Sequence, residues 1–190
     1  MEQNFTRIVL FAALIAVLGL VPPIPLAFGV PISAQSLGVM LAGAVLGSWR
    51  GAAAVLVVQL IVALGLPVLA GGRGGLGVFV GPTAGFLIGW LPAAFVTGLV
   101  VERMRALPVG VAAGLGAVLG GIVVMYAFGI VGFYLVKNAG LGPDDARMSL
   151  GKATLIMAPF IPGDLIKAVL AGILTRTIAR YRPAALTSRA

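Results

Sequence analysis

The sequence predicts an all-α integral membrane protein, a compact bundle of about six transmembrane helices in which residues 1–190 form a single domain. The first observation is composition: 61% of the residues are hydrophobic and 9% are charged, against about 45–50% and about 25% in an ordinary soluble domain. The second is the length of the uncharged stretches, and the third is the distribution of basic residues along the chain. Together they assign the apolar surface to a lipid bilayer.

Spans are expected in the gaps between charged residues, because one charge at the bilayer centre costs about 2.5–3.5 kcal/mol on insertion scales. Residues 8–49 form an uncharged gap of 42 residues, interrupted by prolines at positions 22, 23, 25 and 31. Proline is avoided inside helices, so this gap predicts two spans joined by a hairpin loop. We expect the apolar run that follows Arg7 to be a retained first span and not a signal peptide.

Four further spans follow. Residues 51–72, 74–101 and 106–136 are uncharged over 22, 28 and 31 residues, and each stretch predicts one span. A sixth is expected at about 153–175, which is apolar but contains Asp164 and Lys167. The gaps therefore predict six spans.

Six spans place both termini on one side of the membrane, and the positive-inside rule indicates the cytoplasmic side. With the termini inside, eight of the 13 basic residues lie in the cytoplasm and four lie outside. The sequence therefore predicts a multi-pass protein of the bacterial cytoplasmic membrane with both termini cytoplasmic. The inner set is Arg7, Arg50, Arg103, Arg105, Arg176, Arg180, Arg182 and Arg189, and the outer set is Arg73, Lys137, Arg147 and Lys152.

Several classes of function are excluded. The chain contains no cysteine and no histidine, so thiolate nucleophiles, Cys/His zinc sites and the commonest general base are absent. We expect no catalytic residues, no metal site and no cofactor. The net charge of +8 comes from scattered basic residues beside apolar runs, which is typical of topology signals and not of a nucleic-acid surface. The chain lacks a Walker motif, so any ATP-driven step requires a partner.

Small residues recur every four positions, a spacing that lets membrane helices approach closely. Such rows occur at Gly43/Gly47/Gly51, at Gly81/Gly85/Gly89, at Gly110/Gly114 and, in the first span, at Ala12/Ala16. Packing within the chain is the main interpretation of these rows. For Ala12 and Ala16 two interpretations stay open: packing within this chain, or docking against a partner protein.

The stretch from Gly71 to Pro82 is glycine-rich and predicted to lie outside the membrane. Its letters Gly72-x-Gly74-x-x-Gly77 match the dinucleotide-binding fingerprint, but no β-α-β unit surrounds them, so that interpretation is rejected. Glycine backbone can fold closely over a bound ligand. A plain hairpin connection is the alternative.

The strongest functional signal is the run from Pro159 to Lys167. Asp164 and Lys167 are three residues apart, which places them on one helical face within reach of each other or of a shared ligand. Ionisable residues at membrane depth predict a functional site. The alternative is a helix that begins only at Gly163, with Asp164 as a first-turn acid and Lys167 as its structural partner.

Four stretches, in this order, resemble the BioY family, the biotin-specific S components of energy-coupling-factor (ECF) vitamin transporters. They are residues 30–39 (VPISAQSLGV), 65–72 (GLPVLAGG), 81–89 (GPTAGFLIG) and 161–167 (IPGDLIK). Two departures are small: Ser33 stands where a threonine is common, and Ala84 where a second glycine is common.

The resemblance implies an S-component-like bundle whose pocket opens to the outside beneath the first and third loops. It implies that Asp164 and Lys167 reach the ureido ring of biotin, for which a carboxylate acceptor and an ammonium donor are suited. Arg73 is the cationic candidate for the biotin carboxylate. The orienting polar candidates are Gln35, Thr83 and Tyr126, and the aromatic candidates for the apolar rings are Phe79 and Phe160.

The resemblance also implies partners: biotin, the lipid bilayer, and an ECF transmembrane coupling subunit with ATPase subunits that energise uptake. The family has an alanine pair in the first span, which favours partner docking at Ala12 and Ala16. Two alternatives to biotin uptake stay open, namely an S component for another small vitamin and a membrane enzyme that uses Asp164. The enzyme hypothesis lacks a second acid or a histidine to complete a catalytic set.

Overall fold

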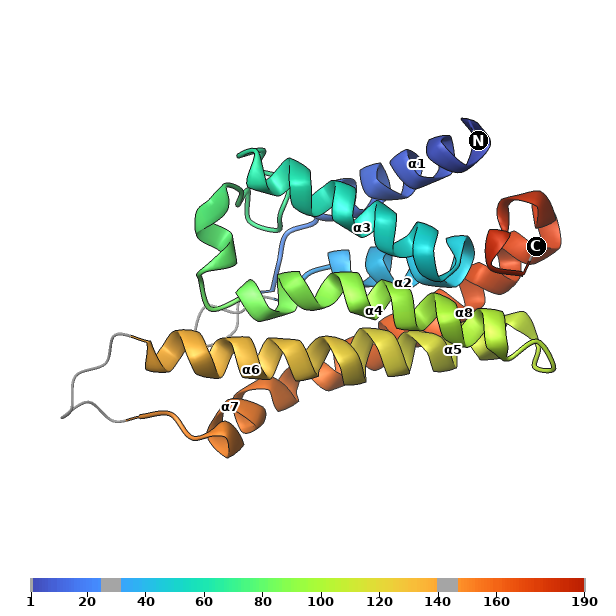
Figure 1. The fold of residues 1–190 in the computed structure, drawn as a ribbon. Coiled ribbons are helices and arrows are strands. Elements are labelled where there is room, and N and C mark those ends of the chain that lie inside the picture. Colours follow the sequence, from blue (N-terminus) through green and yellow to red (C-terminus); the bar gives the residue numbers. More distant parts are fainter. Residues whose placement is uncertain (1, 25–31, 140–146, 190) are drawn as a thin grey trace.

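The computed structural model describes residues 2–24, 32–139 and 147–189, and these fold into six helical rods (Figure 1). The first four are α1 (Glu2–Leu18), α2 (Gln35–Leu46), α3 (Ser48–Ala63) and α4 (Ala84–Arg103). The fifth rod joins α5 (Val109–Val118), the π-helical η3 (Leu119–Val124) and α6 (Met125–Asn138). The sixth joins α7 (Leu150–Met157), η4 (Ala158–Phe160) and α8 (Ile161–Tyr181). Three 3₁₀ turns complete the described elements: η2 (Leu76–Phe79), η5 (Pro183–Ala185) and η6 (Thr187–Arg189).

The predicted all-α membrane bundle is confirmed, with one rod for each predicted span. Three rods, 84–103, 109–138 and 150–181, are long and apolar enough to cross a membrane, whereas α2 and α3 are shorter apolar helices. The helix boundaries differ from the charge gaps. The fourth rod begins at Ala84 because the glycine-rich stretch before it forms a loop. Elsewhere helices extend past the gaps, so that α3 includes Arg50, α4 includes Arg103 and the sixth rod spans residues 150–181.

Helix α2 forms the centre of the bundle. Its 12 residues extend about 18 Å, less than the roughly 30 Å hydrocarbon core. Every residue of α2 except Leu37 is buried, and α2 packs against α1, α3, α4, α5 and α8. Because neighbouring helices cover it, α2 does not have to match the thickness of the bilayer.

A one-residue turn at Gly47 reverses the chain between α2 and α3. Gly47 has φ of +92°, a conformation that glycine adopts without steric cost. The first peptide N–H of α3, on Ser48, donates to Glu102 Oε1 at 2.8 Å, and Ser48 Oγ donates to Glu102 Oε2 at 2.9 Å. A carboxylate from the end of α4 therefore caps the positive N-terminus of α3.

Glycines form the closest helix crossings, as the small-residue rows predict. A methyl group added to Gly51 would lie 2.7 Å from Gly43 Cα, and one added to Gly85 would lie 2.8 Å from Gly132 Cα. Gly110 of α5 likewise faces Gly172 of α8. The row at positions 43, 47 and 51 does not lie on one helix, since Gly47 forms the turn that brings Gly43 against Gly51.

Both described ends of the chain lie at the same end of the bundle (Figure 1). Arg7 of α1 donates to the Ala184 carbonyl at 2.7 Å, and Arg189 donates to the carbonyls of Met104 and Leu107 at 3.0 Å each. Arg50 lies at this end too, with a 3.4 Å contact to the Thr187 carbonyl. Residues that the charge analysis assigned to one side of the membrane are therefore neighbours in the fold.

Candidate ligand-binding site

A cavity lies between α2, α4, α6 and the start of α8, with the loop between α3 and α4 on one side. Its walls combine apolar and aromatic side chains with a few polar ones, as is common in small-molecule sites. The lining residues are Ile32, Ser33, Gln35, Ser36, Leu69, Ala70, Arg73, Thr83, Phe86, Leu87, Trp90, Met125, Tyr126, Phe160, Asp164 and Lys167.

Asp164 and Lys167 form an ion pair in the cavity wall, with Lys167 Nζ 2.8 Å from Asp164 Oδ1. Lys167 also donates to Ser36 Oγ at 2.9 Å and to the Ser33 carbonyl at 2.7 Å. An ammonium has three N–H donors, so each can have a protein acceptor. The ion pair is therefore linked to the N-terminal end of α2.

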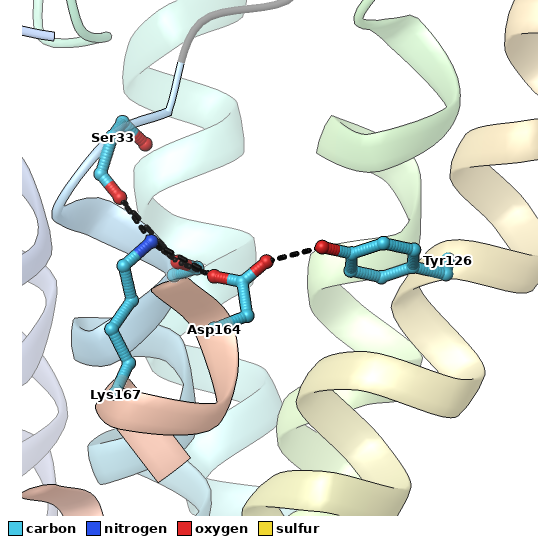
Figure 2. A network of polar contacts seen from close by, with 5 residues as sticks. Ser33, Tyr126, Asp164 and Lys167 are labelled. Carbon is cyan, nitrogen blue, oxygen red and sulfur yellow. Dashed lines mark hydrogen bonds and ion pairs between the residues drawn. The ribbon is translucent and has the colours of Figure 1, made fainter. Parts of the chain in front are cut away.

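Tyr126 completes the network from the opposite side. Its hydroxyl donates to Asp164 Oδ2 at 2.6 Å, a short distance typical of a hydrogen bond to a charged acceptor. Figure 2 shows the Asp164 carboxylate between Lys167 and Tyr126. Asp164 is 7% exposed, so these partners replace the water that burial removes.

The start of α8 bears on both interpretations of the Asp164/Lys167 pair. α8 begins at Ile161, directly after the 3₁₀ turn η4, and Asp164 lies in its first turn with Lys167 as its partner. The structural alternative has the helix begin only at Gly163, whereas α8 continues a rod that starts at Leu150. Both side chains line the cavity, and their contact with a ligand stays a prediction.

Gln35 connects three neighbouring segments of the cavity wall through hydrogen bonds to backbone. Its amide NH₂ donates to the carbonyls of Ile15 at 3.1 Å and Val68 at 3.0 Å, and its Oε1 accepts from the Ala70 N–H at 2.9 Å. The side chain is 1% exposed. Gln35 thus joins α1, α2 and the loop that carries Arg73, and its hydrogen bonds go to backbone.

Arg73 provides a second cation in the cavity wall. Its Nε donates to the Ala70 carbonyl at 3.1 Å, and one terminal nitrogen donates to Thr83 Oγ1 at 3.2 Å. These contacts use two of the five guanidinium N–H groups. Burial lowers the pKa of Arg73 from its ordinary value, but a guanidinium remains charged in proteins.

Comparisons with known proteins place the whole chain in one family. The sequence profile of the BioY family matches residues 2–184. This chain belongs to the BioY family. It is 75% identical over 189 residues to the biotin transporter BioY of Rhodobacter capsulatus, which covers 100% of both chains. It is 57% identical to the biotin transporter BioY of Rhizobium etli, covering 89% of each chain.

A solved structure has the same fold as this BioY-family chain. It is the crystal structure of the S component for biotin from an ECF-type ABC transporter, and it superposes with a TM-score of 0.83 at 29% sequence identity. The match covers 94% of this chain and 92% of the other. The resemblance drawn from the four sequence stretches is therefore confirmed at the level of family and fold.

Most residues selected from the BioY resemblance meet at the cavity. Asp164, Lys167, Arg73, Gln35, Thr83, Tyr126 and Phe160 all line it. Phe79 is not among the lining residues. It belongs to the 3₁₀ turn η2 and packs partly buried against the core, and its contact with biotin stays a prediction.

Sequence reasoning missed several lining residues. Ser33 and Ser36 lie in a stretch that carries the BioY resemblance, and their spacing of three residues at the start of a predicted helix was an available signal. Phe86 and Trp90, four apart on α4, were not selected either, although Phe86 forms an edge-to-face pair with Tyr126 at 5.7 Å between ring centroids. An aromatic spacing of four in an apolar span does not distinguish a ligand wall from a lipid-facing surface.

The alanine pair of α1 does not form one accessible face. Ala12 is 3% exposed, and Ile15 beside it is fully buried, because this side of α1 packs against α2 and α3. Ala16 is partly buried. The burial of Ala12 favours packing within the chain, one of the two interpretations left open, and partner docking at this face stays a prediction.

Proposed function

We propose that this chain binds biotin in the cavity with high affinity and acts as the biotin-specific S component of an ECF transporter. The observation that carries the proposal is the network of Asp164, Lys167, Ser36 and Tyr126 in a membrane-embedded cavity with aromatic walls. Membership of the BioY family and the curated names of its relatives support the same function.

The network matches the ureido ring of biotin group by group. A ureido group presents one carbonyl acceptor and two N–H donors. Lys167 can donate to the carbonyl, while Asp164 and the Ser33 carbonyl can accept from the N–H groups. Without ligand these same groups satisfy one another, so neither charge is left unpaired when biotin leaves.

The ring system and the carboxylate of biotin also have complementary side chains in the cavity. The apolar ring system suits Phe86, Trp90 and Phe160, which line the cavity. Arg73 has guanidinium N–H groups beyond those bonded to Ala70 and Thr83, and an arginine is well suited to a carboxylate. We therefore assign the biotin carboxylate to Arg73.

We also propose the orientation and the partners. The chain lies in the bacterial cytoplasmic membrane with both termini in the cytoplasm, and the cavity faces the outside. The basic end of the bundle supports this orientation through the positive-inside rule. The chain has no Walker motif, so energy for uptake comes from separate ATPase subunits and a transmembrane coupling subunit.

Calorimetry on the purified protein tests the ligand. We expect tight binding of biotin, weaker binding of desthiobiotin, which keeps the ureido ring and lacks the sulfur ring, and no measurable binding of lipoate, which has a carboxylate tail without a ureido group. Equal binding of lipoate and biotin would show that the ureido network does not select the ligand. Binding of another vitamin in place of biotin would favour a different S component.

The membrane-enzyme alternative makes a different prediction. An enzyme that uses Asp164 would return a chemically altered product after incubation with its substrate. Mass spectrometry of ligand released from the purified protein should instead give intact biotin. The BioY family is a family of transport subunits, which disfavours the enzyme.

A further inference from the structure

A second groove lies at the end of the bundle away from the ligand cavity, where the turn at Gly47 joins α2 to α3 and where α4 ends. Its volume is about 520 Å³, and it lies beside the C-terminal turn η6. The lining residues are Leu46, Ser48, Trp49, Arg50, Phe95, Leu99, Glu102, Arg103, Arg105, Thr187 and Ser188.

The groove carries uncompensated positive charge. Arg50, Arg103 and Arg105 contribute three cations, and Glu102 contributes the one carboxylate of the lining set, which leaves two positive charges. Both oxygens of Glu102 already accept hydrogen bonds from Ser48. Within the described residues the one ion pair is that of Asp164 with Lys167, so no carboxylate there pairs with these arginines. This charge favours an anionic ligand.

A buried hydroxyl in the groove lacks a partner. Ser188 is 2% exposed, and its Oγ forms no hydrogen bond to any residue in the part of the chain that the structure describes. Buried hydroxyls are usually bonded, since an unsatisfied one costs about 1–3 kcal/mol. An oxygen of a bound phosphate would accept this hydrogen bond.

The surroundings of the groove are those of a membrane surface. Trp49 is 78% exposed and forms an edge-to-face pair with Phe95 at 5.0 Å between centroids, and exposed tryptophan is enriched at headgroup level. Further along α3, Leu56 and Leu60 are 44% and 55% exposed. Their spacing from Trp49 places them on the same helical face, which gives an acyl chain an apolar path away from the cations.

We propose that this groove binds the phosphodiester headgroup of an anionic phospholipid. Arg50 and Arg103 face the phosphate, Ser188 Oγ donates to it, and the acyl chains lie along the exposed face of α3. The site is independent of biotin binding, and it requires only that this end of the bundle lies at the level of the lipid headgroups.

Native mass spectrometry of delipidated protein with added phosphatidylglycerol or phosphatidylcholine tests the proposal. We expect retention of phosphatidylglycerol by the wild type and loss of retention in the double variant Arg50→Gln/Arg103→Gln. An arginine near a membrane surface contributes a factor of about five in affinity, so the pair contributes about 25-fold. The matched control is Arg180→Gln/Arg182→Gln, which removes the same charge from exposed positions outside the groove and should retain the lipid.

Ser188→Ala provides a test without a change of charge. We expect a several-fold lower affinity for phosphatidylglycerol and unchanged biotin binding. If the double arginine variant fails to fold, this variant tests the proposal in its place. Equal lipid loss in the control pair, equal retention of phosphatidylcholine, or displacement of the lipid by millimolar inorganic phosphate would each overturn the proposal. So would unchanged lipid retention in the groove variant together with loss of co-purifying transporter subunits, which would indicate a protein interface.

Discussion

At the scale of single residues, the proposed biotin site consists of groups that already satisfy one another. Asp164 has partners on both oxygens, and Lys167 has three acceptors within hydrogen-bonding distance. A ligand that offers the same donors and acceptors can replace these bonds with little net loss. Removal of one member instead leaves a buried partner unpaired.

Asp164→Asn and Lys167→Ala should each weaken biotin binding by about thirtyfold or more, because leaving one member of a buried charged set unpaired costs about 2–5 kcal/mol. Calorimetry on folded variants measures the loss. Tyr126→Phe, which removes one hydrogen bond and no charge, is the milder companion. Unchanged affinity in both charge variants would leave the pair a purely structural feature of the start of α8.

Gln35→Leu should lower thermal stability and biotin affinity together. The substitution removes both amide donors and leaves the buried N–H of Ala70 without its acceptor, and an unsatisfied buried group costs about 1–3 kcal/mol. Thermal unfolding with and without biotin measures both effects. Weakened binding at wild-type stability would instead indicate direct contact between Gln35 and the ligand.

At the scale of helices, glycine contacts determine how closely the rods approach. Gly85 of α4 meets Gly132 and the Phe128 carbonyl of α6, and this crossing holds the walls that carry Phe86 and Tyr126 in place. The π-helical turn η3 lies immediately before Met125 and Tyr126, both of which line the cavity. A π turn adds a residue to the helical repeat, and so it alters which side chains of α6 face inward.

Gly85→Ala should destabilise the protein by about 1–3 kcal/mol, since the added methyl group meets backbone that cannot move aside. Gly151→Ala is the matched control within α7, where no atom lies within 4 Å of the added methyl group. The control should be neutral or stabilising by about 0.4–1 kcal/mol. Equal unfolding temperatures for the two variants would contradict this assignment of the α4–α6 crossing.

Substitutions in α1 separate internal packing from partner docking. Ala12→Trp should lower thermal stability and biotin binding together, because Ala12 is buried against α2 and α3. Ala13→Trp, at an exposed neighbouring position, should leave both unchanged. Ala16→Trp is the third variant. If it is stable and binds biotin but no longer co-purifies with the coupling subunits, docking is assigned to Ala16. A stable Ala12→Trp protein would contradict the buried position of this side chain.

At the scale of the whole molecule, charge is divided between the two ends of the bundle. The termini, the α2–α3 turn and the arginines near the end of α4 lie together, whereas Arg73 lies at the ligand cavity. This division supports the proposed orientation in the membrane. It also separates the proposed vitamin site from the proposed lipid site.

Cysteine labelling tests the orientation conveniently, because the chain has no cysteine. Gly77→Cys in the loop before α4 should react with an impermeant thiol reagent added to intact cells, and Ala184→Cys should react only after lysis. Both positions are exposed. Reaction of Ala184→Cys in sealed cells would reverse the proposed topology.

The sequence by itself determined the fold class, the number of helical rods and the Asp164/Lys167 pair. It could do so because a charge in the bilayer is so costly that the positions of charged residues in the sequence indicate where helices cross and where a site lies. Through the BioY resemblance it also located seven of the sixteen lining residues. Tertiary structure alone decided that Gln35 bonds to three backbone groups, that Phe79 lies outside the lining set, and that Ala12 is buried. These outcomes depend on how helices far apart in the chain rotate and pack, and residue spacing within one helix does not specify which neighbour each face meets.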